Sequence, residues 1–150
     1  IATFISAYEN EEYNKDSLKF GYRSFSGINT EFIHKTVLEL KPEDSSIIKK
    51  KQTEYLQHRK KTQPTAVYNA GSVFKNPDGL YAGRLIEEAG LKGYSVGGVE
   101  VSNKHANFFV AKKGASSLDL FKLVEFVKAK VYENSGTSLE EEIIFIGDFE

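Results

Sequence analysis

Hydrophobic and polar positions divide the second half of the chain into short segments of strand and helix type. Residues 80–89 place their apolar side chains on one helical face, and Gly90 is expected to end that helix. A longer helix is expected to begin at Ser116 or Ser117 and to end at Gly136. Short β-branched or aromatic runs predict strands at residues 66–68, 94–101, 107–111 and 142–146. The order of these segments predicts a small β-α-β-β-α-β domain.

The first part of the chain follows a different pattern. Runs of strand-like composition, one of them followed by a polar turn at residues 9–16, occupy residues 1–8, 18–25 and 31–40. Together they predict the edge of an antiparallel sheet. Pro42 and the acidic residues after it mark the start of a helix that runs to about Lys61. We therefore expect an α+β fold in three parts, namely the tail of a sheet domain, a connecting helix and a second small domain, at residues 1–41, 42–64 and 65–150.

Composition mainly excludes classes of function. The 150 residues carry a net charge of −1, which argues against a chain-wide surface for nucleic acid or membranes. The chain contains no Cys, so disulfides and thiolate metal sites cannot form, and a reducing compartment is favoured. No apolar run approaches the ~18 residues of a membrane-spanning helix, and no signal-peptide pattern opens the chain. The three His residues lack ligand spacing, so no metal site is expected.

A cluster of basic residues lies in the expected connecting helix. Residues 49–61 contain five Lys and one Arg against one Glu. Such runs usually form the solvated face of a helix, and binding of an anionic ligand is the alternative. Nucleic-acid binding is a further hypothesis, which the sequence disfavours because no patterned aromatic face accompanies the basic residues.

The loop at residues 69–79 has the most unusual composition. The motifs G-x-x-x-x-G-K-[ST], G-x-G-x-x-G and G-x-S-x-G do not occur in the chain. In this loop Gly71 permits a tight turn beside Ser72, and Lys75 supplies a cation close by. The loop can therefore present a hydroxyl group next to a charge. On composition alone, a Ser beside a Gly more often has only a turn-forming role.

Residues 70–77, Ala-Gly-Ser-Val-Phe-Lys-Asn-Pro, resemble the hallmark loop of the UDP-N-acetylenolpyruvoylglucosamine reductases, also called UDP-N-acetylmuramate dehydrogenases. Further segments resemble the same family in the same order. They are Phe-Gly-Tyr-Arg-Ser at residues 20–24, the segments at residues 82–93 and 97–108, and Leu-Glu-Glu-Glu-Ile-Ile-Phe-Ile-Gly at residues 139–147. The resemblance covers nearly the whole chain and corresponds to the C-terminal portion of the family's proteins.

The resemblance implies a flavin-dependent reductase of bacterial peptidoglycan synthesis. Members of the family use FAD and NADPH to reduce the enolpyruvyl ether of a UDP-sugar, which yields UDP-N-acetylmuramate. By correspondence of motifs, Ser72 would be the proton donor, with Arg23 and Glu142 as its catalytic partners. A guanidinium suits this role because it clamps a carboxylate with two hydrogen bonds and stabilises the charge that builds up there. A hydroxyl beside two cations can act as a general acid toward a reactive enolate.

The resemblance also implies contacts with ligands. The substrate-binding residues would be Tyr22, Lys75, Asn76 and Lys60. Arg59 and Lys61 are alternatives to Lys60, since the spacing does not choose among the three basic residues. Gly71 and Arg23 would lie against the cofactor.

The family's FAD-binding half, with its Gly-rich phosphate-holding loop, corresponds to sequence upstream of this chain. The chain contains no Met and begins at Ile1, so we expect further residues before it. The complete protein is expected to hold FAD, to use NADPH and to bind a UDP-sugar, as a cytoplasmic monomer that contacts neither nucleic acid nor membrane. The alternative is a non-catalytic module that binds a nucleotide sugar without flavin.

Overall fold

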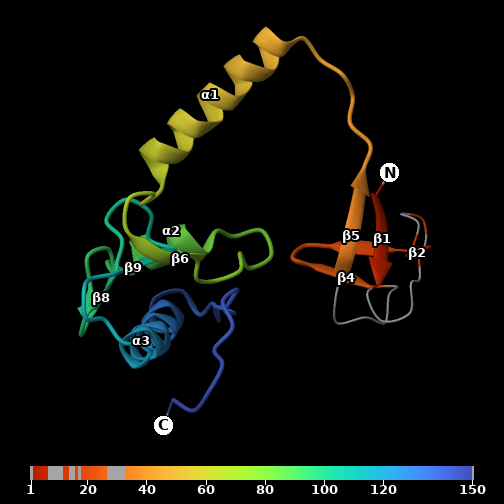
Figure 1. Ribbon diagram of the computed structural model, residues 1–150. Coiled ribbons are helices and arrows are strands. Elements are labelled where there is room, and N and C mark those ends of the chain that lie inside the picture. Colours follow the sequence, from red (N-terminus) through yellow and green to blue (C-terminus); the bar gives the residue numbers. More distant parts are fainter. Residues whose placement is uncertain (1, 7–11, 14–15, 17, 27–32, 150) are drawn as a thin grey trace. The chain divides into compact units, whose positions relative to one another are not determined.

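The computed structural model describes residues 2–6, 12–13, 16, 18–26 and 33–149 (Figure 1). Contacts between Cα atoms divide the chain into two compact units, Ile1–Lys49 and Lys50–Glu150. The division falls within helix α1 (Ser45–Thr62), in the segment that the sequence predicts to connect two domains.

A small antiparallel sheet belongs to the first unit. Its strands are β1 (Ala2–Ser6), β2 (Glu12–Tyr13) and β5 (Ile33–Leu38), in the order β2-β1-β5. Strand β1 pairs with β5 from Ala2 opposite Leu38 to Ser6 opposite Ile33. The predicted antiparallel sheet is thus confirmed for the described parts of the two runs; residues 1, 7–8 and 31–32 lie outside the described residues. The predicted polar turn was wrong at β2, because Glu12 and Tyr13 pair with β1.

Residues 18–25 form a hairpin rather than the single predicted strand. Strands β3 (Lys19–Gly21) and β4 (Ser24–Ser26) pair antiparallel, and Tyr22 and Arg23 form the turn between them. Arg23 has a φ of 55°, the left-handed conformation found in tight turns. A Cβ atom at Gly21 would lie 2.8 Å from the Ser24 hydroxyl oxygen, so glycine lets the strands approach closely here. The period-two pattern therefore predicted β structure correctly, but it did not predict the turn that reverses the chain.

Helix α1 confirms the predicted connecting helix and its end near Lys61, but it begins at Ser45 rather than at Pro42, so Pro42 and the acidic residues precede its first turn. It has no buried residue. At its start, the Asp44 carboxylate accepts a hydrogen bond from the Ser46 amide at 2.8 Å, which satisfies one of the unpaired donors of the first turn. The basic residues at 49–61 are exposed, as in a solvated helix face. Even the apolar side chains of the narrow stripe, Tyr55 among them, are largely exposed.

A four-stranded antiparallel sheet forms the centre of the second unit. Its strands follow the order β6-β9-β8-β7 and comprise β6 (Tyr68–Ser72), β7 (Ser95–Val96), β8 (Val99–Val101) and β9 (Phe108–Ala111). The strand predicted at residues 94–101 is split into the β7–β8 hairpin by a turn at Gly97 and Gly98. Strand β6 begins where the strand predicted at residues 66–68 ends, and it continues to Ser72.

Two helices complete the second unit. They are α2 (Ala82–Glu88) and α3 (Ser117–Ser135), and α3 packs against α2, β7 and β8 (Figure 1). Ser116 caps α3 through a capping box with Asp119, and Gly136 ends it in the left-handed conformation, as predicted. The core between helices and sheet is apolar and contains Val73, Phe74, Ala82, Leu85, Ile86, Leu91, Val99, Val101, Ala106, Phe109, Leu123, Val124, Val127, Val131 and Leu139.

The strand predicted at residues 142–146 is not formed. Only one residue pair, Phe74 and Glu141, makes a β-bridge there. The amides of Glu142 and Ile143 both point to the Val73 carbonyl oxygen, at 2.8 and 3.4 Å, so a regular ladder cannot continue. Beyond this point the rings of Phe121, Phe145 and Phe149 pack on one another, which replaces strand pairing by aromatic contacts. The predicted final strand was wrong, whereas the α+β class is confirmed.

No helix of the described residues is long and apolar enough to cross a membrane.

Candidate active site

Two buried side chains fix the position of the loop after β6, which contains the residues of the family's hallmark motif. Ser72 ends the strand and is half-buried, and the next two side chains, Val73 and Phe74, are each only 1% exposed. These apolar side chains fix the loop in the core, so that Ser72 before them and Lys75 after them stay at the surface. Gly71 has a φ of 85°, and a Cβ atom there would meet open space, so the backbone beside Ser72 is accessible to a ligand.

The C-terminal segment brings Glu142 to this loop through backbone hydrogen bonds. The amide of Glu142 donates to the Val73 carbonyl oxygen at 2.8 Å, and the amide of Lys75 donates to the Glu140 carbonyl oxygen at 2.8 Å. Lys128 of α3 binds the carboxylate of Glu141 at 2.8 Å and so ties the segment to the helix as well. The backbone of Glu142 is therefore bonded to Val73, the residue that follows Ser72 in the sequence.

Lys75 makes an ion pair with the carboxylate of Glu140. The Glu140 side chain is 72% exposed, and an ion pair so open to water contributes little stability. A phosphate or carboxylate of a ligand can therefore replace Glu140 as the partner of Lys75 at small cost. The ammonium group lies in the same loop as Ser72, and the predicted contact of Lys75 with an anionic ligand stays a prediction.

Asn76 has a structural contact that the sequence did not predict. Its side-chain oxygen accepts a hydrogen bond from the Ala82 amide at 3.0 Å, at the first turn of α2. Tyr81, the N-cap residue of this helix, offers no side-chain hydrogen bond. Asn76 thus caps α2 from outside the helix, and this contact fixes the orientation of its amide group.

We expect the substitution Asn76→Ala to lower the free energy of unfolding by about 1 kcal/mol, because it removes the acceptor for the Ala82 amide. Asn76→Asp is the matched control: it keeps an oxygen at that position and adds a negative charge at a helix N-terminus. Urea unfolding followed by circular dichroism measures both variants. Equal losses for Ala and Asp would contradict the capping role.

Tyr22 and Arg23 lie in the first unit, at the tip of the β3–β4 hairpin. Both are exposed, and the Arg23 guanidinium carbon lies 5.6 Å from the centre of the Tyr22 ring, a cation–π distance. A non-glycine residue with positive φ is uncommon and often found at functional sites. The predicted partnership of Arg23 with Ser72 stays a prediction.

The three basic candidates at the end of α1 are exposed. The Arg59 guanidinium donates to the Gln63 side chain at 3.2 Å. The Lys60 carbonyl oxygen accepts a hydrogen bond from the Lys104 ammonium group, so the last turn of α1 is bound to the β8–β9 connection through its backbone. Neither contact links Lys60 or its neighbours to the loop of Ser72, so the predicted ligand contact of Lys60 stays a prediction.

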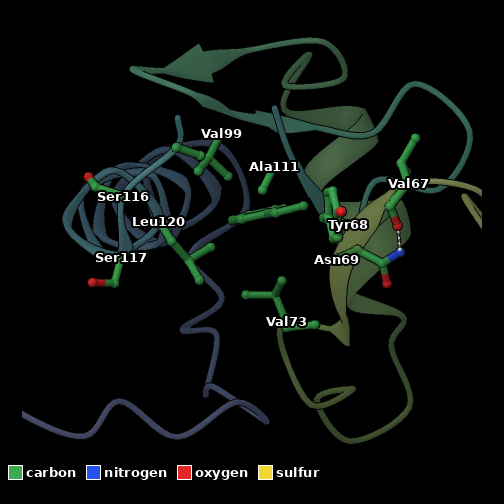
Figure 2. A pocket seen from close by; sticks show the side chains of 12 residues that line it. Val67, Tyr68, Asn69, Val73, Val99, Ala111, Ser116, Ser117 and Leu120 are labelled. Atoms are coloured by element: carbon green, nitrogen blue, oxygen red, sulfur yellow. Dashed lines mark hydrogen bonds between the residues drawn. The ribbon is translucent and has the colours of Figure 1, made fainter. Parts of the chain in front are cut away.

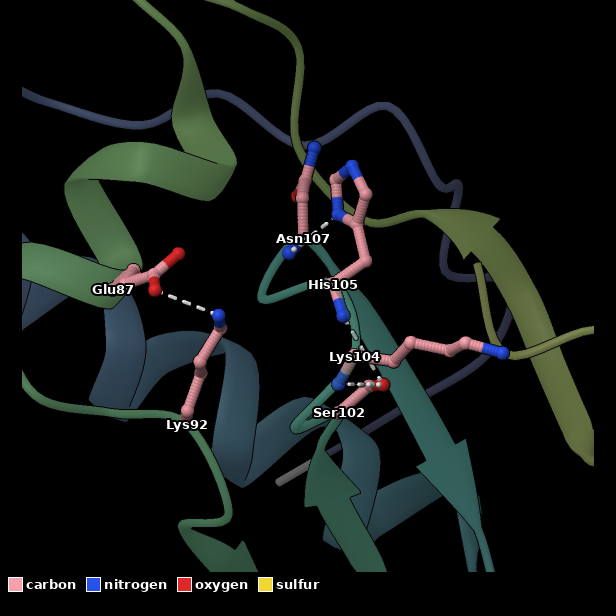
Figure 3. Close-up of polar contacts among 6 residues, drawn as sticks. All are labelled: Glu87, Lys92, Ser102, Lys104, His105 and Asn107. Atoms are coloured by element: carbon pink, nitrogen blue, oxygen red, sulfur yellow. Dashed lines mark hydrogen bonds and ion pairs between the residues drawn. The ribbon is translucent and has the colours of Figure 1, made fainter. Parts of the chain in front are cut away.

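The β8–β9 connection contributes polar residues that the sequence analysis missed (Figure 3). Asn107, which is 4% exposed, accepts a hydrogen bond from the Phe74 amide at 2.9 Å and donates one to the Phe74 carbonyl oxygen at 2.8 Å. The His105 ring accepts the Asn107 amide at Nδ1, at 3.2 Å. The Ser102 hydroxyl oxygen accepts from the Lys104 amide at 3.1 Å. The signal in the sequence was a single Asn between the apolar residues Ala106 and Phe108.

Burial lowers the pKa of the His105 imidazole below its ordinary value of 6.5, and the charge of Lys92 lowers it further. A hydrogen bond involving the backbone of His105 and the charge of Glu87 act in the opposite direction. The neutral ring is the form that can accept the Asn107 amide at Nδ1. The folded state therefore binds a proton at His105 less readily than the unfolded chain does.

We expect the free energy of unfolding to fall as the pH drops below about 6.5, since the unfolded chain then takes up a proton that folded His105 resists. The substitution His105→Asn keeps an acceptor near the position of Nδ1 but does not titrate. It should reduce this pH dependence between the folded pKa and pH 6.5. Urea unfolding at a series of pH values measures the slope, and an unchanged slope in the variant would assign it to other groups.

An apolar cavity of about 500 Å³ lies beside β6, between the sheet and the start of α3 (Figure 2). Its lining has no charged side chain and consists of Val67, Tyr68, Asn69, Ala70, Val73, Val99, Phe109, Ala111, Ala115, Ser116, Ser117 and Leu120. None of the predicted site residues lines it. A cavity of this composition does not suit a diphosphate or a carboxylate, so the charged loop after β6 is the better candidate site. In the described part of the chain, no three His, Asp or Glu side chains gather as a metal ion requires.

Comparisons with known proteins identify one family. The sequence profile of the UDP-N-acetylenolpyruvoylglucosamine reductase C-terminal domain matches residues 63–146. The UDP-N-acetylenolpyruvoylglucosamine reductase of Geotalea uraniireducens is 41% identical over 89% of this chain and 44% of its own length. That of Heliobacterium modesticaldum is 41% identical over 99% of this chain and 49% of its own length.

A solved structure is similar as well. The crystal structure of UDP-N-acetylenolpyruvylglucosamine reductase from Thermus caldophilus has a TM-score of 0.77 and 34% sequence identity, over 94% of this chain and 50% of that one. The chain thus spans about half the length of the relatives that it matches. The profile match, residues 63–146, covers most of the second unit, Lys50–Glu150. The chain therefore belongs to the UDP-N-acetylenolpyruvoylglucosamine reductase family and contains the family's C-terminal domain.

Proposed function

We propose that the protein containing this chain reduces the enolpyruvyl ether of UDP-N-acetylglucosamine to UDP-N-acetylmuramate, with FAD and NADPH, in peptidoglycan synthesis. The observation that carries the proposal is the hydrogen bond from the Glu142 amide to the Val73 carbonyl oxygen at 2.8 Å. It joins the residue that we propose to assist proton transfer to Val73, the neighbour in sequence of the proposed proton donor Ser72. Family membership supplies the chemistry that these residues would perform.

The residues around Gly71 fit a bulky cofactor. Gly71 leaves open space next to the backbone where a side chain would otherwise stand, so a flat ring can approach Ser72 closely. When bound there, FAD reduced by NADPH would supply the hydride that the vinylic carbon of the substrate needs. Gly71 and Arg23 are the residues that we propose to lie against it.

Within this chain, Ser72 donates a proton to the carbon next to the one that is reduced. Arg23 binds the substrate carboxylate with two hydrogen bonds and stabilises the enolate charge that develops on it. Glu142 orients the donor or a bound water, and its nearness to the Ser72 loop supports this role. Tyr22, Lys75, Asn76 and Lys60 bind the substrate; the two Lys residues would contact its anionic groups.

We also propose the organisation of the protein around this site. Residues 1–41 would form the end of an FAD-binding domain, and residues 65–150 would form the substrate-binding domain. Residues 42–64 would connect the two domains. The protein would act as a monomer in the cytoplasm, where UDP-sugars and NADPH are made. Absence of Cys supports a reducing compartment, and the net charge of −1 disfavours nucleic acid as a partner.

The test uses the longest natural polypeptide that contains this chain. We expect the purified polypeptide to show flavin absorbance, which NADPH bleaches and the enolpyruvyl UDP-sugar restores under anaerobic conditions. UDP-N-acetylglucosamine, which lacks the enolpyruvyl group, is the control substrate and should not restore the absorbance.

A colourless polypeptide that cannot be reconstituted with FAD would refute the enzymatic proposal. If such a polypeptide still bound the UDP-sugar in calorimetry, the alternative of a nucleotide-sugar-binding module would hold. The half-buried loop cation Lys75 is compatible with that alternative, because binding a phosphate requires no flavin.

A further inference from the structure

We propose that Asn107 is a positioning residue for proton donation by Ser72. Its side-chain amide hydrogen-bonds to the backbone of the loop after Ser72. This contact extends the pairing of β6 with β9 by one residue pair. The inference rests on the proposed function, because it concerns how the proposed proton donor is kept in place. It adds a residue of the β8–β9 connection to the loop and the C-terminal segment, which carry Ser72 and Glu142.

Asn107 pairs with the loop through its backbone and its side chain together. Its carbonyl oxygen accepts the Val73 amide at 2.9 Å. Its side-chain oxygen accepts the Phe74 amide at 2.9 Å, and its side-chain nitrogen donates to the Phe74 carbonyl oxygen at 2.8 Å. The amide group therefore satisfies both backbone groups of Phe74, as a facing strand residue would do in an antiparallel ladder.

The position of this rung explains its importance. The β6–β9 register shifts between Asn69 and Ser72, and Ser72 opposite Phe108 is the last regular pair. A strand end next to an irregularity is where backbone pairing is weakest and where a side chain can be re-aimed. Asn107 continues the pairing directly after Ser72 and so prevents the loop from separating from β9 at that point.

The chemistry of the contact requires asparagine. Asn107 is 4% exposed, and a buried amide or carbonyl of Phe74 left without a partner would cost stability. The contact needs one donor and one acceptor on the same short side chain, which Asn provides and Asp or Leu does not. The requirement at position 107 is therefore chemical as well as steric.

The opposite side of the same loop is bound by the C-terminal segment. The Val73 amide donates to Asn107, and the Val73 carbonyl oxygen accepts the amide of Glu142. Two successive peptide groups after Ser72 are thus held between Asn107 and Glu142. In addition, the His105 ring fixes the Asn107 backbone amide at 3.2 Å, so the residue that holds the loop is itself held (Figure 3).

The experiment measures both half-reactions in the longest natural polypeptide that contains this chain. We expect Asn107→Asp to slow reoxidation of the flavin by the enolpyruvyl sugar by about 100-fold, since a displacement of about 1 Å at a reacting group has an effect of this size. Flavin reduction by NADPH should stay within about threefold of the original rate. The control Asn103→Asp changes an exposed Asn of the same connection and should alter neither rate. Equal losses in both half-reactions would mean that Asn107 supports only the fold, and would overturn the proposal.

A double-mutant cycle with Ser72→Ala tests whether Asn107 acts through Ser72. If it does, Asn107→Asp should have little further effect on reoxidation once Ser72 is removed. Additive effects would overturn the proposal. A harmless Ser72→Ala substitution would instead refute the proposed proton donor, so the two failures can be distinguished.

A measurement on the unsubstituted protein covers the case in which Asn107→Asp does not fold. We expect the Phe74 amide hydrogen to exchange with solvent at least 100-fold more slowly than an unprotected loop amide, because it is buried and bonded to Asn107. Exchange at the rate of an unprotected amide would overturn the proposal.

Discussion

Ser72→Ala should leave flavin reduction by NADPH near its original rate and slow reoxidation by the enolpyruvyl sugar about 10²–10⁴-fold, the usual range for a lost general acid. The half-reactions separate because only the second transfers a proton to the substrate. Ser72 stands at the end of a strand whose next two side chains are fully buried, so its removal should leave the loop in place. An effect confined to one half-reaction would therefore report chemistry rather than folding.

Anaerobic stopped-flow absorbance of the flavin measures both rates for Ser72→Ala. Ser95→Ala is the matched control, since Ser95 is an exposed serine of β7 in the same sheet and should not affect either rate. If reoxidation survives in Ser72→Ala as well as reduction does, Ser72 is not the proton donor. A loss in both half-reactions would indicate that the loop contributes to cofactor binding instead.

The two ends of helix α3 were predicted accurately from the sequence. Helix α3 has both of its boundaries marked by local chemistry, a Ser–Asp capping box at Ser116 and Asp119 and a left-handed Gly136. Such signals act within a few residues, so they can be read without knowledge of the rest of the fold. An antiparallel sheet was likewise predicted from the three strand-like runs, but only β1 and β5 share one, and residues 18–25 form a separate two-stranded sheet.

The failures share a physical cause, which is the dependence of strands on distant partners. The run at residues 18–25 has strand periodicity throughout, yet the backbone reverses at Arg23, and period-two patterns do not reveal a turn formed by non-glycine residues. The final run is equally strand-like, but two of its amides share one acceptor at Val73. Whether a β-branched run becomes a strand depends on the partner that folding places beside it.

Some residues of the candidate site were likewise predicted from the sequence, and others were not. The resemblance selected Ser72, Lys75 and Glu142, and the structure brings their segments together in the second unit through backbone hydrogen bonds. Local patterns alone would have left Ser72 as a turn serine. Asn107 was missed because its function depends on the backbone of Phe74, which no spacing rule connects to it. Side chains that bind a ligand occur in motifs, whereas side chains that position a motif are found from contacts.

Arg23→Lys is expected to slow reoxidation by the enolpyruvyl sugar about 10²–10³-fold, the usual effect of removing one group that stabilises a developing oxyanion. Lys keeps the positive charge but cannot form the two parallel hydrogen bonds that a guanidinium makes with a carboxylate. The substitution also leaves the backbone strain at position 23 unchanged. Arg and Lys both have a Cβ atom and meet the same cost at a φ of 55°, so the hairpin turn should form in both.

The same stopped-flow assay measures Arg23→Lys, with Arg84→Lys as the control. Arg84 is exposed on α2 and pairs with Glu88 at 2.7 Å, so its replacement by Lys changes the same atoms away from the candidate site. Flavin reduction should remain within about threefold of normal in both variants, while only Arg23→Lys loses reoxidation. An unchanged reoxidation rate would exclude Arg23 from the site.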